Sequence, residues 1–278
     1  MSRARLLLLL AGVLTLAAVV AVAQRYRRDR SDRGGTPTWP LDPELPRDVF
    51  RFVRIRYASG GDGRYWRGWG WNTDEPDAEL NLSFRLQQMT SMKVHPEGEI
   101  VELTDKELFD YPFIYIVEPG GMLLADDEVA ALRRYLLNGG FLMVDDFWGE
   151  REWANFYREI RCVFPEQKYD PVELEMDHAI FHCVFPLKMT KNQLQVPNFV
   201  TGERSQYTHV TWERSDAREV HIKGIFDDKG RMMAIICHNT DNGDGWEREG
   251  EYQYYFREFS EKKAYPLMIN ILFYAMTH

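Results

Sequence analysis

The residues best suited to chemistry in this sequence are carboxylates that directly follow predicted buried strands. Asp145 and Asp146 come after one apolar run, and Glu118 follows another. Glu150 lies in the same loop as the two aspartates. Paired carboxylates can serve as the acid and base of a hydrolysis, or can share a bound cation. These four residues are the candidate catalytic residues, with capping or internal hydrogen bonding as the alternative role of the two aspartates.

A second group of residues could bind a ligand. A glycine- and tryptophan-rich loop follows the first predicted strand, where backbone amides could hold an anion and indoles could stack on sugar rings. A polar run over 238–244 is rich in oxygen, as cation loops are. Neither segment has the spacing of a known phosphate loop or EF-hand, so plain turns are the alternative. The candidate ligand-binding residues are Gly60, Gly61, Trp69, Trp71, Trp148, His238 and Asp241. The candidate metal ligands are Asp241 and Asp244, and the cofactor stays unknown.

These residues need a scaffold that brings strand ends together. From residue 49 onward, short apolar runs alternate with helical patterns, and two runs flank a turn at 227–230 as in a hairpin. This alternation predicts a three-layer α/β fold with a mostly parallel open sheet, flavodoxin-like, and a β-hairpin in the C-terminal half. The first, third and fourth strands should be parallel neighbours or near-neighbours whose loops open on one edge. The expected strands are 53–57, 100–103, 113–117, 141–144, 220–226 and 232–237, and the expected helices are 76–92, 125–138, 153–163 and 266–276.

The N-terminus has the features of a targeting segment. Two arginines precede an apolar run over 6–23 that ends in an Ala-Val-Ala cleavage pattern. The run is also long enough to stay uncut as an anchor. Arginines within 25–30 favour the opposite orientation, but the order of the segments favours export. We therefore predict a periplasmic protein, or one anchored to the cytoplasmic membrane and facing outward. The expected organisation is a signal peptide or anchor over 1–23, a disordered linker over 24–47 and a single α/β domain over 48–278.

Composition limits the partners. The net charge is −9, which argues against a nucleic-acid partner, because phosphate binding needs a basic surface. We expect membrane contact only through the N-terminal segment, and a small-molecule or carbohydrate ligand or an envelope protein as partner. The three cysteines, Cys162, Cys183 and Cys237, stand among apolar neighbours and are predicted to be buried free thiols.

Several motifs along the chain together resemble a known bacterial family. They are 53–57, Trp69-Gly70-Trp71, Asp77-x-Glu79-Leu80-Asn81, Tyr115 to Gly120, Gly139 to Gly149 and Asp177 to His182. The family is called domain of unknown function 4159, and it is similar in fold to the class I glutamine amidotransferase superfamily, including trehalose-utilisation-type proteins. It has no established activity. The resemblance implies that the turn after Val144 is where amidotransferases carry their catalytic cysteine. Aspartates stand there in this chain, and aspartate cannot form a glutamyl thioester, so glutaminase activity is not expected.

Two functions fit these residues. One is a non-catalytic ligand-binding or interaction module at the cell envelope, since the superfamily nucleophile is replaced. The other is a carbohydrate-active or metal-assisted hydrolase that uses crevice carboxylates. Geometry separates the two: a single carboxylate in the crevice favours binding, and two facing carboxylates with perturbed pKa values favour an enzyme. The sequence alone favours binding.

Overall fold

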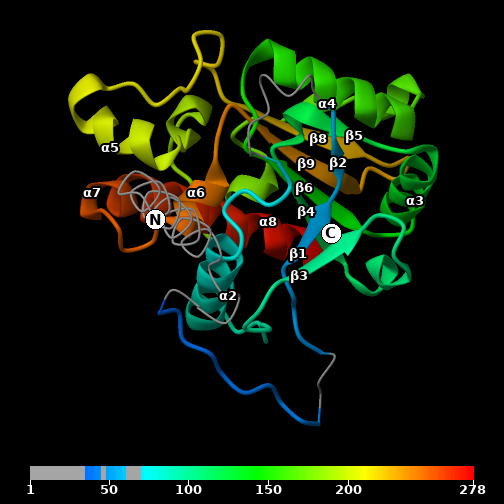
Figure 1. The fold of residues 1–278 in the computed structure, drawn as a ribbon, viewed down its shortest axis with the longest axis horizontal. Helices are drawn as coiled ribbons and strands as arrows, with labels where there is room; N and C mark the ends of the chain where they lie inside the picture. Colours follow the sequence, from blue (N-terminus) through cyan, green and yellow to red (C-terminus); the bar gives the residue numbers. More distant parts are fainter. Residues whose placement is uncertain (1–34, 45–47, 61–69) are drawn as a thin grey trace, which may run out of the picture. The chain divides into compact units, whose positions relative to one another are not determined.

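The computed structural model describes residues 35–44, 48–60 and 70–278. All helices and strands described lie in one compact unit, Thr38–His278. A seven-stranded sheet has the order β3-β1-β4-β6-β9-β8-β7, and β2 and β5 form a separate two-stranded ribbon (Figure 1). The strands are β1 (Val53–Arg56), β2 (Ala58–Ser59), β3 (Glu99–Glu102), β4 (Phe113–Val117), β5 (Met122–Leu123), β6 (Phe141–Asp145), β7 (Val172–Glu173), β8 (His221–Phe226) and β9 (Met232–His238).

Helices connect most of these strands. The α-helices are α2 (Asp77–Met89), α3 (Asp126–Leu137), α4 (Gly149–Val163), α5 (Phe199–Thr208), α6 (Asn242–Glu247), α7 (Gln253–Tyr255) and α8 (Tyr265–Thr277). A π-helix over Phe256–Ala264 joins α7 to α8. Short 3-10 helices cover Lys106–Asp110, Pro119–Gly121, Gln167–Tyr169, Ala179–Phe181 and Lys191–Leu194.

The pairing of the strands brings four strand ends to one edge. Strands β3, β1, β4, β6 and β9 are parallel, with β8 antiparallel to β9 and β7 antiparallel to β8. This confirms the predicted parallel neighbours, which are β1, β4 and β6, and the predicted hairpin, which is β8 and β9. The register pairs Val117 with Asp145 and Val144 with Ile236. The loops after β1, β4, β6 and β9 therefore start at the same edge of the sheet.

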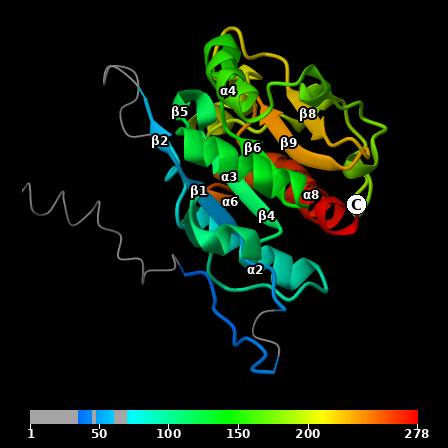
Figure 2. The ribbon, with the colours of Figure 1, turned by 90° about the vertical axis from the view of Figure 1, so that its right-hand side faces the viewer.

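The sheet is covered on both faces, as a three-layer α/β protein requires. In β4, Tyr115 and Val117 pack in one core with residues of α2 and α8, and Ile114 and Ile116 pack in another with residues of α3 and α4 (Figure 2). A strand buried on both faces needs apolar residues without alternation, and every residue of β4 is buried. The continuous apolar runs of the sequence are explained by these two cores.

Some details differ from the sequence-based expectation. Helix α4 begins at Gly149, four residues before the predicted start. All three cysteines are free, but only Cys237 is buried, and Cys162 and Cys183 are exposed. Trp39 falls in the stretch 24–47, and its indole nitrogen donates a hydrogen bond of 2.7 Å to the Val94 carbonyl. That stretch therefore contacts the domain at one point at least. The predicted targeting segment, 1–23, lies outside the described residues. Within the described residues, no helix has the length and hydropathy needed to cross a membrane.

Candidate functional site

A pocket of about 780 Å³ lies where the strand ends converge. It takes lining residues from the loops after β4, β6 and β9, from the segment before α2, and from the start of α5. Nine acidic and three basic side chains line it: Asp74, Glu118, Asp146, Glu152, Glu213, Asp241, Asp244, Glu247 and Glu251, with Arg151, Arg214 and Arg248. The excess of carboxylates makes this a cation-attracting cavity. A second cavity, of about 850 Å³, contains none of the candidate residues.

Asp145 does not line this pocket and instead joins neighbouring elements of the fold. Its side chain is fully buried and accepts hydrogen bonds from the Tyr115 hydroxyl (3.2 Å), the Asn242 amide (2.9 Å) and side chain (2.8 Å), and the Gly243 amide (3.2 Å). Burial raises the pKa of Asp145 to about 7, although the hydrogen bonds oppose that rise. Both oxygens are therefore used to fasten the first turn of α6 to the end of β6.

Asp146, the next residue, belongs to the pocket. Its backbone has φ of 54°, in the left-handed region, and its side chain is 7% exposed and lines the cavity. One oxygen, Oδ1, accepts a hydrogen bond of 2.9 Å from the Trp148 indole nitrogen. Burial, followed by the nearby charge of Glu118, raises the pKa of Asp146 well above its usual range. The two aspartates of this turn thus have separate positions, one structural and one facing the cavity.

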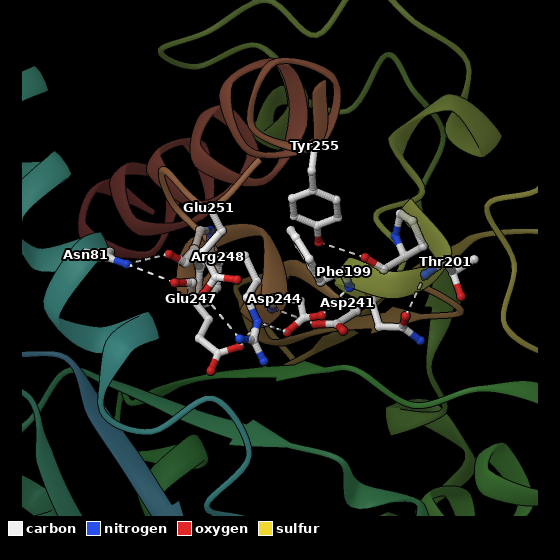
Figure 3. Close-up of polar contacts among 12 residues, drawn as sticks. Asn81, Phe199, Thr201, Asp241, Asp244, Glu247, Arg248, Glu251 and Tyr255 are labelled. Atoms are coloured by element: carbon white, nitrogen blue, oxygen red, sulfur yellow. Dashed lines mark hydrogen bonds and ion pairs between the residues drawn. The ribbon is translucent and has the colours of Figure 1, made fainter. Parts of the chain in front are cut away.

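Helix α6 contributes three more carboxylates on one face. Asp241 caps the helix and accepts a hydrogen bond of 2.8 Å from the Asp244 amide. Asp244 accepts one of 2.5 Å from the amide of Phe199, at the start of α5. Residues three apart share a face of a helix, so Asp241, Asp244 and Glu247 lie in a row. Figure 3 shows Arg248 beside Asp244 and Glu247. Its Nε atom is 3.7 Å from Asp244 Oδ1 and 2.5 Å from Glu247 Oε2.

Asp74 completes the cluster from the segment before α2. Its Oδ2 atom is buried and has no hydrogen-bond partner among the described residues. The turn that carries it is held by Arg54, which donates to the carbonyls of Trp71 (2.9 Å) and Thr73 (2.7 Å). Arg54 is itself fully buried and paired with Glu79. A buried ion pair inside the domain therefore positions a carboxylate with an unpartnered oxygen at the pocket.

The carboxylates form two overlapping groups with the spacing of metal ligands. Asp74, Asp146 and Asp241 each offer an oxygen within 4.8 Å of the others, and so do Asp74, Asp244 and Glu247. A donor set made only of carboxylate oxygens suits hard cations such as Mg²⁺, Ca²⁺ and Mn²⁺. This arrangement can hold a divalent cation.

Burial and crowding raise pKa values throughout the cluster. The pKa of Glu118 rises to about 8, first through burial and then through Glu152 and Glu213. The pKa of Glu247 also rises to about 8, first through burial, although Arg248 opposes the rise. Burial is also the main cause of the raised pKa values of Asp74 and Asp241, followed by neighbouring carboxylates. Clustered anions of this kind take up protons or a cation.

Backbone strain is concentrated at the same place. Five non-glycine residues in the described part of the chain have positive φ, and three of them, Asp74, Glu118 and Asp146, line the pocket. A fourth, Asn239, follows β9 and donates a side-chain hydrogen bond to the Glu219 carbonyl. Each such conformation costs about 1–3 kcal/mol and is commonest at functional sites. The strain supports a functional assignment for this edge.

The structure places five of the sequence-derived candidates in the pocket lining: Glu118, Asp146, Trp148, Asp241 and Asp244. Asp145 is not in the lining and anchors the first turn of α6 to the end of β6. Glu150 is exposed on α4, and its backbone amide donates to Asp216. Neither residue lines the cavity, so the site differs from the predicted catalytic set at these two positions.

The ligand-binding candidates divide in the same way. His238 is buried against Phe147 and Trp153 with its pKa lowered to about 4, mainly by burial, so it packs in the core. Gly60 donates its amide to the Gly121 carbonyl (2.9 Å), and Trp71 stacks against Arg56. None of these three lines the pocket, and Gly61 and Trp69 lie outside the described residues.

Five pocket carboxylates were not among the candidates from sequence: Asp74, Glu152, Glu213, Glu247 and Glu251. The spacing of three from Asp241 through Asp244 to Glu247 is a signal that could have predicted one helical face. The glycines at 243 and 245 made that segment resemble a turn instead. Asp74 has the pattern of a residue near a helix start, and Glu213 lies in a segment without periodicity, so neither gave a local signal.

Comparison with known proteins adds a family assignment. No curated protein matches the sequence. Residues 51–276 match the model of a family described as Domain of unknown function (DUF4159). That range contains every carboxylate of the pocket. Because the match covers most of the chain, the protein belongs to the DUF4159 family.

Proposed function

We propose that this pocket binds a divalent cation and that the chain is a metal-assisted hydrolase. The observation that carries the proposal is the group formed by Asp74, Asp146 and Asp241, whose oxygens lie within 4.8 Å of one another. Leaving several buried carboxylates close together without counter-charge is unfavourable, and a bound cation removes that penalty.

Each part of the site has a role in this proposal. Asp74, Asp146 and Asp241 would hold the cation, which would make a bound water more acidic and polarise the substrate. Glu118 lines the same pocket, and its pKa of about 8 suits a group that exchanges protons near neutral pH. In the reaction, ionised Glu118 would accept the proton of the attacking water as the water oxygen bonds to the scissile centre, and Glu118 would then give that proton to the leaving group as its bond breaks.

The number of carboxylates favours this proposal over the non-catalytic module expected from sequence. Glu118, Asp146 and Asp241 all reach the cavity, and the pKa of each is raised. The net charge of −9 argues against a nucleic-acid substrate, so the proposed substrate is a small molecule or a carbohydrate. An envelope protein remains the alternative partner of a binding module.

The finer assignment of the fold and the location are part of the proposal. Numbered along the chain, the five parallel strands have the order 2-1-3-4-5, which supports a flavodoxin-like or class I glutamine amidotransferase-like fold. The apolar N-terminal run supports export. A reporter fused to the C-terminus should be active outside the cytoplasmic membrane, and activity confined to the cytoplasm would reverse this topology.

Thermal unfolding of chelator-treated protein tests the cation site. Mg²⁺, Ca²⁺ or Mn²⁺ should raise the melting temperature, and a cation at a hundred times its Kd stabilises by about 2.7 kcal/mol. Asp146→Asn should abolish that shift, whereas Glu150→Gln, a matched change outside the lining, should retain it. A wild-type melting temperature that no divalent cation moves would refute the site. Glu118→Gln separates catalysis from binding, because it should keep the shift and lose hydrolysis of a panel of chromogenic esters and glycosides.

A further inference from the structure

We infer that the pocket holds two divalent cations and that Asp74 bridges them. This inference rests on the proposed cation site. Asp146 and Asp241 share Asp74 on one side, and Asp244 and Glu247 share it on the other. A carboxylate has two oxygens, so a single aspartate can ligate both ions. Two ions that share one aspartate can stabilise both the attacking and the leaving oxygen of a hydrolysis.

One cation cannot use all five carboxylates. Oxygens around Mg²⁺ lie about 2.0–2.1 Å from the ion, so any two ligands are at most about 4.2 Å apart. Among the described residues, no group whose oxygens all lie within 4.8 Å of one another contains both the Asp146–Asp241 pair and the Asp244–Glu247 pair. The two pairs therefore correspond to two centres.

One oxygen of Asp74, the residue common to both centres, points to a ligand independently of the acidic character of the pocket. Asp74 Oδ2 is buried and has no hydrogen-bond partner among the described residues. Asp146 and Asp241 are only 7% and 3% exposed, and each gives one oxygen to a protein donor, the Trp148 indole and the Asp244 amide respectively. Buried acceptors are nearly always paired, so Asp74 Oδ2 indicates a missing partner, and the surrounding carboxylates favour a positively charged one.

The two centres differ in their competition with arginine. Arg248 approaches Glu247 to 2.5 Å and Asp244 to 3.7 Å, so a cation at the second centre must displace it. None of the ion pairs among the described residues engages Asp146 or Asp241. The centre formed by Asp74, Asp146 and Asp241 is therefore the tighter one.

Titration with Mn²⁺ tests this arrangement, with free and bound Mn²⁺ distinguished by electron paramagnetic resonance. The chelator-treated full chain should bind two Mn²⁺, one more tightly, and should show a spin-coupled pair when saturated. Glu247→Gln should leave only the tight ion, and Asp241→Asn should weaken the tight one. Arg248→Met, which removes the competing charge, should tighten the second ion roughly tenfold. Glu150→Gln should behave as wild type.

The outcomes separate the inference from the proposed function. One Mn²⁺ per wild-type chain, unchanged by Glu247→Gln and by Arg248→Met, would overturn the two-cation centre and leave the single site intact. Failure of the wild type to bind any Mn²⁺ would overturn the proposed function as well. Glu247 and Arg248 are partly exposed, so their variants should fold, and circular dichroism checks that they do.

Discussion

Two sets of buried charges in this domain behave in opposite ways. Asp145 has donors for both oxygens, and Arg54 is paired with Glu79 and with two backbone carbonyls. At the pocket, Asp74 Oδ2 is buried without a donor among the described residues, and the charged neighbours that act on it most strongly, Asp244 and Glu247, are also acidic. The first set places donors or the opposite charge beside each buried charge, whereas the pocket places carboxylates next to one another. Crowding of like charges around an oxygen without a donor, more than burial, therefore distinguishes the site from the structural anchors.

Removing one partner of the buried Arg54–Glu79 ion pair should have the largest effect on stability. Arg54→Met leaves Glu79 as a buried unpaired charge and releases the turn that carries Asp74. We expect a loss of about 3–5 kcal/mol in the free energy of unfolding, measured by urea denaturation. A variant as stable as wild type would show that the pair is not a structural anchor.

Asp145→Ala should have the next largest effect. The change leaves the amides of Asn242 and Gly243 buried without an acceptor, and we expect a loss of about 2–4 kcal/mol. The neighbouring Asp146→Asn should shift the midpoint of urea unfolding very little, because asparagine tolerates the left-handed backbone and removes a repelled charge. Equal losses at the two positions would remove the distinction between them.

The pH dependence of stability should reveal the crowded carboxylates of the pocket. Glu118 and Glu247 have pKa values near 8 in the folded protein and ordinary values when unfolded. Between about pH 4.5 and pH 8 the folded state therefore binds more protons than the unfolded state, so metal-free stability falls as pH rises through this window. Urea midpoints at several pH values measure the fall, and the variant Glu118→Gln with Glu247→Gln should make it smaller, the remainder being due to the buried aspartates whose pKa values are also raised. A flat wild-type profile would contradict the pKa assignment.

The smallest effect is expected at Glu150, which is exposed and outside the lining. Glu150→Gln should change the unfolding free energy by less than about 0.5 kcal/mol and leave cation binding unaltered. A measurable loss of cation-induced stabilisation in this variant would extend the cation site along α4 and contradict the placement of Glu150 outside it.

The sheet and one part of the site could be predicted from the sequence for clear physical reasons. The apolar runs that became β4 and β6 are long enough to require burial on both faces, which implies parallel neighbours. Parallel neighbours place the residues after them, Glu118 and Asp146, at one edge. Choosing between Asp145 and Asp146 was not possible, because the choice depends on the donors of α6, far along the chain.

The remaining part of the site depends on tertiary structure. Asp74 reaches the cluster because Arg54 holds its turn, and Glu247 reaches it because Asp145 and Asp241 stabilise a six-residue helix that contains two glycines. Neither of these long-range contacts is signalled by a local sequence pattern. His238 follows a strand as Asp146 does, but its ring packs between Phe147 and Trp153 in the core, so position after a strand is not sufficient for a site.

Calorimetric titration of the metal-free protein with Mn²⁺ at pH 7 measures whether the pocket carboxylates hold a cation. Running it in two buffers with different ionisation enthalpies counts the protons released on binding. Because Glu118 and Glu247 carry protons below a pKa of about 8, cation binding should release protons and should tighten as pH rises from 6 to 8. Asp146→Asn should lose most of the binding heat. Binding without proton release, or heat unchanged in Asp146→Asn, would contradict a cation held by this cluster.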